Sequence, residues 1–202
     1  KKLNMDDKYL DNVFTSGEAA LRAIKLEKHG KKFYHLGPEK DQSLFMGLER
    51  NNTSLVDCDY ILCTGLFDKT MDNLEYYTNL LSKFTSKIFI CTNPDLTVHK
   101  GETEEYCAGT VASIFQKLGG KVIYYGKPYE EVYKMCLIND QKTLIIGDNL
   151  RTDIKGANNL KLDSIFISNG VHREEFKNEN ELKNLLNKYN VEVNYYQSNL
   201  KW

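Results

Sequence analysis

The chain contains no run of about 18 apolar residues, so it lacks the sequence signature of a transmembrane helix. Its first residues, Lys1 to Asp7, lack the apolar core of a secretory signal peptide. Neither sign of charge dominates, because 27 lysines and arginines stand against 28 aspartates and glutamates, for a net charge of −1. This balance gives no electrostatic reason to expect binding to nucleic acid or to an acidic membrane. We therefore expect neither partner.

Two short motifs are also absent. The five cysteines form no Cys-x-x-Cys pair: they are Cys58, Cys63, Cys91, Cys107 and Cys136. Four of them lie in or beside apolar runs, so we interpret them as small core residues rather than a redox or zinc site. Such cysteines suit a reducing compartment, and a cytoplasmic location is expected. No Gly-x-Gly-x-x-Gly follows an expected strand, which argues against a dinucleotide-binding enzyme.

What the chain does contain is a regular alternation of strand and helix patterns. Short β-prone apolar runs predict strands at 32–36, 59–65, 86–92, 121–126, 143–146 and 163–168. Amphipathic patterns predict helices at 15–28, 39–50, 70–84, 106–118 and 179–189, and the tail is a candidate edge strand. Thr15 with Glu18 fits a capping box, and Asp68 is expected to cap the helix at 70–84. The alternation predicts an α/β fold with a mostly parallel sheet.

Two carboxylates follow one of these strands. Residues 143–146 read as a fully buried strand, and Gly147 and Asp148 stand at its end. Thr152 is expected to cap a short helix that begins with Asp153. Ligands bind outside the carboxyl ends of strands in open α/β sheets. Asp148 and Asp153 are therefore predicted at a ligand-binding edge, although a single Gly-Asp pair at a strand end is also common in plain loops.

A lysine follows the preceding strand. The strand at 121–126 ends in Gly126, and Lys127 is held before Pro128, which is expected to start a helix. A lysine at one strand end and two aspartates at the next would share one crevice. Such a site suits an anionic substrate together with Mg²⁺, which takes oxygen ligands from few protein groups. The ammonium group can offset charge on a phosphoryl group during its transfer.

These segments resemble motifs of a known family. Gly126-Lys127-Pro128 and the later Gly147-Asp148-Asn149-x-x-Thr152-Asp153-Ile154 resemble the third and fourth motifs of the haloacid dehalogenase (HAD) superfamily, most closely its class IIA, NagD-like phosphatases. Further matches run in the family order: Phe14-Thr15-Ser16-Gly17-Glu18-Ala19, Cys91-Thr92-Asn93-Pro94-Asp95, Gly119-Gly120-Lys121 and Leu200-Lys201-Trp202. Each motif alone is short, but together they cover nearly the whole chain.

The family's first motif has no match. It is an Asp-x-Asp that follows an apolar run near the N-terminus, whereas Asp57-Cys58-Asp59 precedes such a run and Asp6-Asp7 follows no strand. The second motif, a Ser/Thr-Asn strand end, should also precede Thr15. The chain therefore resembles a HAD phosphatase without the N-terminal segment that carries both motifs. By itself this chain would lack the nucleophile and is expected to be inactive.

The resemblance implies a Rossmann-like parallel-sheet core with an inserted α/β cap of the C2 type. Residues 1–14 would be a remnant of the N-terminal core, residues 15–92 the cap, and residues 93–202 the C-terminal part of the core. It also implies a magnesium-dependent phosphatase that acts on a small phosphate monoester through an aspartyl-phosphate. Dimerisation through the cap is an expectation by analogy.

The resemblance also implies roles for particular residues. Asp148 would ligate Mg²⁺, and Asp153 would act behind it, directly or through water. Lys127 would hold the nucleophile and a phosphate oxygen. Asn93, Asp95 and Asn149 would lie near the substrate; a plain turn is the other interpretation of Asn93 and Asp95, and a loop-shaping role that of Asn149.

Three other functions fit parts of the sequence. A catalytically inactive binding or scaffold protein would retain the fold without the nucleophile. A signalling receiver domain also uses an aspartate, a Lys-Pro pair and Mg²⁺, but there the aspartate precedes the Lys-Pro, whereas Asp148 follows it. A dinucleotide-binding enzyme would need the glycine motif that is absent.

Overall fold

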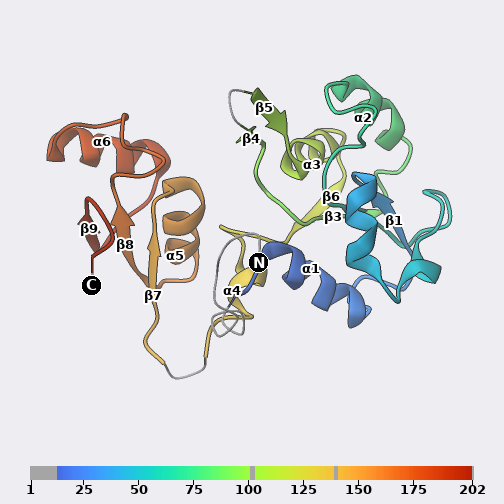
Figure 1. Cartoon of the computed structure of the whole chain (residues 1–202), viewed down its shortest axis with the longest axis horizontal. Coiled ribbons are helices and arrows are strands. Elements are labelled where there is room, and N and C mark those ends of the chain that lie inside the picture. The colour runs from blue at the N-terminus through green and yellow to red at the C-terminus, as the bar shows by residue number, and fades with distance from the viewer. Residues whose placement is uncertain (1–12, 101–102, 139–140, 202) are drawn as a thin grey trace. The chain divides into compact units, whose positions relative to one another are not determined.

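The computed structural model describes residues 13–100, 103–138 and 141–201 of the chain. The fold is α/β, as predicted, and the chain forms two compact units, Lys1–Gly126 and Lys127–Trp202 (Figure 1). Most of the expected N-terminal remnant, residues 1–12, and the terminal Trp202 lie outside the described residues. Each unit is built around its own parallel sheet.

The first unit contains a four-stranded parallel sheet with the strand order β1-β2-β3-β6. Its strands are β1 (Phe33–Leu36), β2 (Tyr60–Cys63), β3 (Ile88–Cys91) and β6 (Lys121–Tyr124). Their register aligns the carboxyl ends, because Leu36, Cys63, Cys91 and Tyr124 are successive partners across the sheet. All four strands fall within the apolar runs that predicted them.

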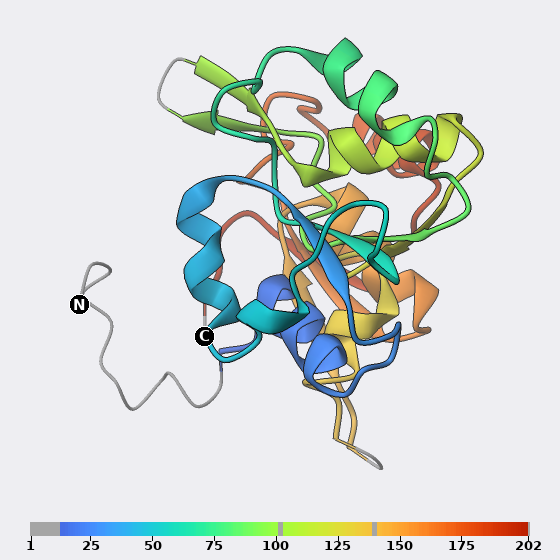
Figure 2. The same ribbon diagram turned by 90° about the vertical axis from the view of Figure 1, so that its right-hand side faces the viewer.

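Alternate residues of these strands face opposite sides of the sheet. On one side Ile61, Cys63, Phe89 and Cys91 pack with two helices, α2 (Leu74–Leu81) and α3 (Ala108–Lys117). Those two helices also contact each other, as the turned view in Figure 2 shows. On the other side the ring of Phe33 packs against Phe45 and Tyr60, at ring-centre distances of 5.3 and 6.1 Å.

Thr15 and Asp68 were predicted to cap helices, and the structure shows what each does. Helix α1 (Ser16–Lys25) begins after Thr15, whose Oγ1 accepts the Glu18 N–H at 3.1 Å, as predicted. The predicted cap of α2 was wrong, because Asn73 caps it by accepting the Tyr76 N–H at 3.0 Å. Asp68 instead accepts the Glu39 N–H at 3.0 Å, so its carboxylate binds the first residue of the 3₁₀ helix Glu39–Phe45 rather than the start of α2.

The helical prediction at 39–50 was confirmed in part, because the segment is helical but not one continuous helix. This segment forms two 3₁₀ helices, Glu39–Phe45 and Glu49–Asn51. Gly47 lies between them at a φ of 84°, a left-handed conformation that interrupts any continuous helix.

A short hairpin that was not predicted from the sequence follows the Asn93-Pro94-Asp95 turn. It consists of β4 (Thr97–Lys100) and β5 (Thr103–Tyr106), which pair antiparallel. Beyond it, α3 and β6 complete the unit, so the first compact unit continues past residue 92 to Gly126. The division into a cap at 15–92 and a core from residue 93 stays a prediction.

The second unit contains a three-stranded parallel sheet of β7 (Leu144–Gly147), β8 (Asp163–Ile167) and β9 (Tyr195–Gln197), in that order. The tail therefore adds an edge strand, as expected. Helix α6 (Glu179–Tyr189) forms at the predicted residues, and the unit also contains the short helices α4 (Glu130–Tyr133) and α5 (Lys155–Asn159). One core cluster of this unit contains Leu150, Ile154, Phe166, Leu182, Leu185 and Val191.

One prediction about this sheet was wrong. The strand β7 is not fully buried, since Leu144 is 45% exposed and its neighbours are half-buried. The reason is its position, because β7 is an edge strand that pairs only with β8 in this sheet. Among the described residues, no helix is both long and apolar enough to cross a membrane.

Candidate active site

The carboxyl end of β7 leads into a turn that carries the predicted acidic residues. Asn149 caps the π-helical turn Leu150–Ile154, and its Oδ1 accepts the Arg151 N–H at 2.9 Å. Its carbonyl oxygen also accepts the Asp153 N–H at 2.9 Å. Thr152 was therefore wrongly predicted as the cap, because the turn begins earlier than the sequence pattern suggested. Asn149 shapes this turn through its backbone and its side chain.

Asp153 is buried, at 6% exposure, and both of its oxygens are engaged. Oδ1 accepts from Lys127 Nζ at 2.6 Å, and Oδ2 accepts the Asn149 N–H at 3.1 Å. Gly147 leaves the space for this carboxylate, since a Cβ on Gly147 would overlap the Asp153 side chain. The structure thus brings together the lysine and one of the two aspartates that the sequence placed at successive strand ends.

Lys127 keeps contact with solvent while it is held by Asp153. Its side chain is 53% exposed, against 9% for the Asp153 side chain. Water screens such a half-exposed pair, so its contribution to stability is modest. The pair instead fixes where the ammonium group stands, with donor capacity left for a further anion.

Asp148 has a different environment. Its Oδ2 accepts the Val171 N–H at 3.1 Å, from the segment that follows β8. Gly170 lies so close that a Cβ there would overlap the carboxylate of Asp148. Within the described part of the chain, the other oxygen, Oδ1, makes no hydrogen bond. Asp148 therefore offers one oxygen as a ligand, whereas Asp153 offers none directly.

These residues offer Mg²⁺ one direct protein ligand, the Oδ1 atom of Asp148. Within residues 13–100, 103–138 and 141–201, no group of three or more His, Cys, Asp or Glu side chains could hold a metal ion. Mg²⁺ does not need such a cage, because it commonly binds through one or two carboxylates, with water and phosphate completing its shell. Asp148 could be one such ligand, and Asp153 could act only through Lys127 or a water molecule.

A buried histidine beside Asp148 was not predicted from the sequence. His172 is fully buried, and its Nε2 accepts the Leu150 N–H at 3.1 Å. Its Nδ1 lies 2.6 Å from Glu175 Oε1. Burial raises the pKa of Glu175, but hydrogen bonds from His172, Lys188 and Tyr189 outweigh it and leave this pKa below its usual value. The only signal in the sequence is that His172 follows the end of a predicted strand.

Two other segments with aspartates make local backbone hydrogen bonds. Asp59 accepts the backbone N–H groups of Lys31 and Lys32, both at 2.8 Å, and these bonds lower its pKa. It precedes β2, so the interpretation that Asp57-Cys58-Asp59 is not the missing motif agrees with the structure. In the first unit, Asn93 Oδ1 accepts the Asp95 N–H at 3.2 Å within a turn. A substrate-binding role for Asn93 and Asp95 stays a prediction.

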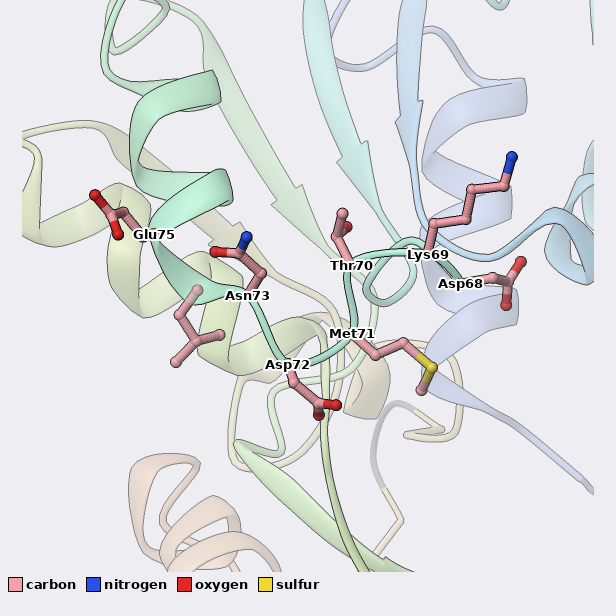
Figure 3. A pocket seen from close by; sticks show the side chains of 8 residues that line it. Asp68, Lys69, Thr70, Met71, Asp72, Asn73 and Glu75 are labelled. Carbon is pink, nitrogen blue, oxygen red and sulfur yellow. The ribbon is translucent and has the colours of Figure 1, made fainter.

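Two hollows lie in the described part of the first unit, and neither is lined by Asn93, Asp95 or Asp59. One hollow of about 610 Å³ is formed by the consecutive residues 68–75, which Figure 3 shows around the loop before α2. A second, of about 490 Å³, shares Asp68, Lys69 and Thr70 with it and is also lined by the rings of Tyr34, Phe67 and Tyr76. Neither hollow contains a residue that was assigned to a site from the sequence.

Known proteins resemble this chain in both sequence and fold. A family described as HAD-hydrolase-like matches residues 124–189, which contain Lys127, Asp148 and Asp153. The chain is 27% identical over 167 residues to the ribonucleotide monophosphatase NagD of Escherichia coli K12, covering 80% of this chain and 64% of that protein. It is 23% identical over 172 residues to the 5'-nucleotidase YutF of Bacillus subtilis, covering 82% and 65%. The chain thus spans just under two thirds of these relatives.

Solved structures have the same fold. A haloacid dehalogenase-like hydrolase from Brucella suis 1330 superposes with a TM-score of 0.71 at 28% identity, covering 94% of this chain and 72% of that chain. A p-nitrophenyl phosphatase from Archaeoglobus fulgidus gives a TM-score of 0.70 at 18% identity, covering 91% and 70%. At that identity the second likeness concerns the fold alone.

Proposed function

Because this chain belongs to the haloacid dehalogenase superfamily, in its NagD-like class IIA branch, we propose that it forms part of a magnesium-dependent phosphatase. The substrate would be a small phosphate monoester, the class to which the substrates named for its relatives belong. The observation that carries the proposal is the end of β7, where Asp148 Oδ1 has no hydrogen-bond partner among the described residues and Asp153 accepts from Lys127.

Each of these residues would have a separate task. Asp148 would ligate Mg²⁺ through Oδ1, and the bound cation would supply charge neutralisation at the phosphoryl group. Lys127 would donate hydrogen bonds to a phosphate oxygen and to the nucleophile, and so reduce their repulsion. Asp153 would keep the ammonium group in place through the 2.6 Å ion pair. Asn149 would hold the turn, with Asn93, Asp95 and Asn149 near the substrate.

The nucleophile in this proposal is an aspartate from a segment that would precede Lys1 in a longer protein. Its carboxylate oxygen would attack phosphorus while the bond to the ester oxygen breaks, and the second aspartate of the same Asp-x-Asp motif would donate the proton with which the alcohol leaves. Water would then hydrolyse the resulting aspartyl-phosphate, releasing phosphate and restoring the carboxylate. A cap within residues 15–92 would exclude bulk water from these steps. A cytoplasmic location and a homodimer formed through the cap belong to the same proposal.

The alternative is a protein that binds phosphate esters or a partner without turnover. What favours it is that no Asp-x-Asp follows an apolar run in this sequence, since Asp57 and Asp59 precede β2. The fold and the Lys127–Asp153 pair would persist in such a protein.

The test is hydrolysis of 4-nitrophenyl phosphate with and without Mg²⁺, by the 202-residue chain and by a version that includes the upstream sequence. We expect turnover only in the longer version and only with Mg²⁺, because positioning and charge provide most of phosphoryl-transfer catalysis. An inactive longer version would favour the binding role, and activity independent of metal would contradict the proposed cofactor.

A further inference from the structure

His172 is a fully buried ionisable side chain in the second unit, and the proposed reaction does not use it. Its hydrogen bonds define its protonation. The Leu150 N–H can only donate, so the Nε2 atom that it meets at 3.1 Å must be an unprotonated acceptor. The proton of the neutral imidazole therefore lies on Nδ1 and is donated to Glu175 Oε1 at 2.6 Å. This arrangement requires one tautomer of a neutral histidine.

Glu175 is itself held from the opposite side. Its Oε2 accepts from Tyr189 Oη at 3.1 Å and from Lys188 Nζ at 3.3 Å. The ring of Tyr189 lies 5.1 Å from the imidazole, centre to centre, and Arg151 donates to Tyr189 Oη at 2.8 Å. The imidazole thus has a fixed orientation, set by α6 on one side and by the turn after β7 on the other.

The segment that carries His172 is hydrogen-bonded to the Asp148 loop at two points. One is the bond from the Leu150 N–H to His172 Nε2, and the other is the bond from the Val171 N–H to Asp148 Oδ2, both at 3.1 Å. Gly170 closes the gap, because no Cβ fits between it and the Asp148 carboxylate. With Oδ2 fixed in this way, the direction in which Oδ1 points is fixed as well.

We propose that His172 is a positioning residue for Asp148, and that Glu175 sets the tautomer that this role requires. The proposal rests on the proposed function in one respect, since Asp148 is taken there as the metal ligand. Groups that orient a metal ligand typically change metal affinity by about 10- to 100-fold when they are removed. The same size of effect is expected for His172, although it acts through the backbone of Leu150 and Val171.

The first test uses the uniformly ¹⁵N-labelled 202-residue chain and needs no metal. Long-range ¹H–¹⁵N correlation spectra of the imidazole should show His172 protonated at Nδ1 and bare at Nε2. Hydrogen exchange at the Leu150 amide should be slow in the wild type and faster in a His172→Leu variant, together with a shifted Val171 amide resonance. A proton on Nε2, or Leu150 and Val171 amides that do not respond to His172→Leu, would overturn the proposal.

The second test measures Mn²⁺ affinity as a substitute for Mg²⁺, alongside the free energy of unfolding. His172→Leu should weaken Mn²⁺ binding by about 10- to 100-fold. His172→Gln, whose amide oxygen can still accept from Leu150, should restore much of it. Should His172→Leu fail to fold, Glu175→Leu replaces it, because that side chain is 33% exposed and its loss removes the acceptor that sets the His172 tautomer; it should weaken Mn²⁺ binding in the same direction. Equal losses of stability in both His172 variants without a change in affinity would show a merely structural role.

The outcomes separate this proposal from the proposed function. If Asp148→Asn abolishes Mn²⁺ binding while His172→Leu folds and binds normally, the positioning role is wrong and the metal site stands. If the wild type and Asp148→Asn bind Mn²⁺ alike, the proposed metal role fails. The tautomer and the Leu150 and Val171 amides then still decide whether His172 positions Asp148.

Discussion

Replacing Lys127 by methionine in the longer, active protein is expected to lower kcat/KM for an aryl phosphate by about 100- to 1,000-fold, the usual effect of removing one charged or hydrogen-bonding group from a transition state. The ammonium group stands 2.6 Å from Asp153 and is half-exposed, so it can meet an incoming phosphate. Methionine keeps the length of the side chain but neither its charge nor its donors. Steady-state kinetics at saturating Mg²⁺ measure the effect.

Stability should also fall, by about 1–3 kcal/mol, because the substitution leaves the buried Asp153 carboxylate without its charged partner. Lys134→Met is the matched control. Lys134 is 52% exposed, against 53% for Lys127, and pairs at 2.9 Å with the exposed Glu130, so its loss removes a similarly exposed ammonium group away from the end of β7. Equal turnover in the two variants would contradict the role of Lys127, as would a loss of activity explained entirely by unfolding.

The largest effect on stability is expected at Phe89. Its side chain is fully buried in β3, and its ring stacks on that of Phe115 with centres 4.9 Å apart. Phe89→Ala removes this contact and leaves a cavity under α3, which should lower the free energy of unfolding of the first unit by about 3–5 kcal/mol. Hydrogen exchange read by mass spectrometry reports on each unit separately, since local stability differs across a structure.

The control for this variant is Phe14→Ala, because the Phe14 side chain is 40% exposed and the same atoms are removed. It should change stability by less than about 0.5 kcal/mol, as surface substitutions usually do. Peptides from β8, in the second unit, should exchange at the wild-type rate in both variants. A Phe89→Ala protein as stable as Phe14→Ala would contradict the packing described for this face of the sheet.

The elements that the sequence predicted well are those with strong local signals. The apolar runs around Ile61 and Ile90 became central strands because burial on both faces of a parallel sheet requires continuous apolar residues. Thr15 capped its helix because the capping hydrogen bond involves only residues three apart. Lys127 and Asp153 were expected to meet because parallel strands end at one edge of a sheet. They do meet, at 2.6 Å, but β6 and β7 belong to different sheets, so the pair forms within the second unit and not by that rule.

The predictions that failed depended on contacts between distant segments. Asp68 has the right residue type to cap α2, but its carboxylate instead accepts a hydrogen bond from the Glu39 N–H, which is far away in sequence. His172 carries no local motif, and its importance arises only when the segment after β8 folds against Leu150. The partial exposure of β7 reflects its place at the edge of a sheet, which the apolar pattern of one strand does not encode.

The most direct test of the proposed function is whether the free oxygen of Asp148 binds a divalent cation. Mn²⁺, which prefers the same oxygen ligands as Mg²⁺, would be titrated into the ¹⁵N-labelled chain while amide line widths are followed. Asp163→Asn is the matched control, because the Asp163 Oδ1 only accepts from Asn194 and an amide oxygen can do the same.

We expect selective broadening of the amides of Asp148, Leu150 and Val171 in the wild type and in Asp163→Asn. Excess Mg²⁺ should reverse this broadening, and Asp148→Asn should lack it. Broadening that persists in Asp148→Asn, or that centres on residues away from the end of β7, would contradict the central claim that Asp148 binds the metal.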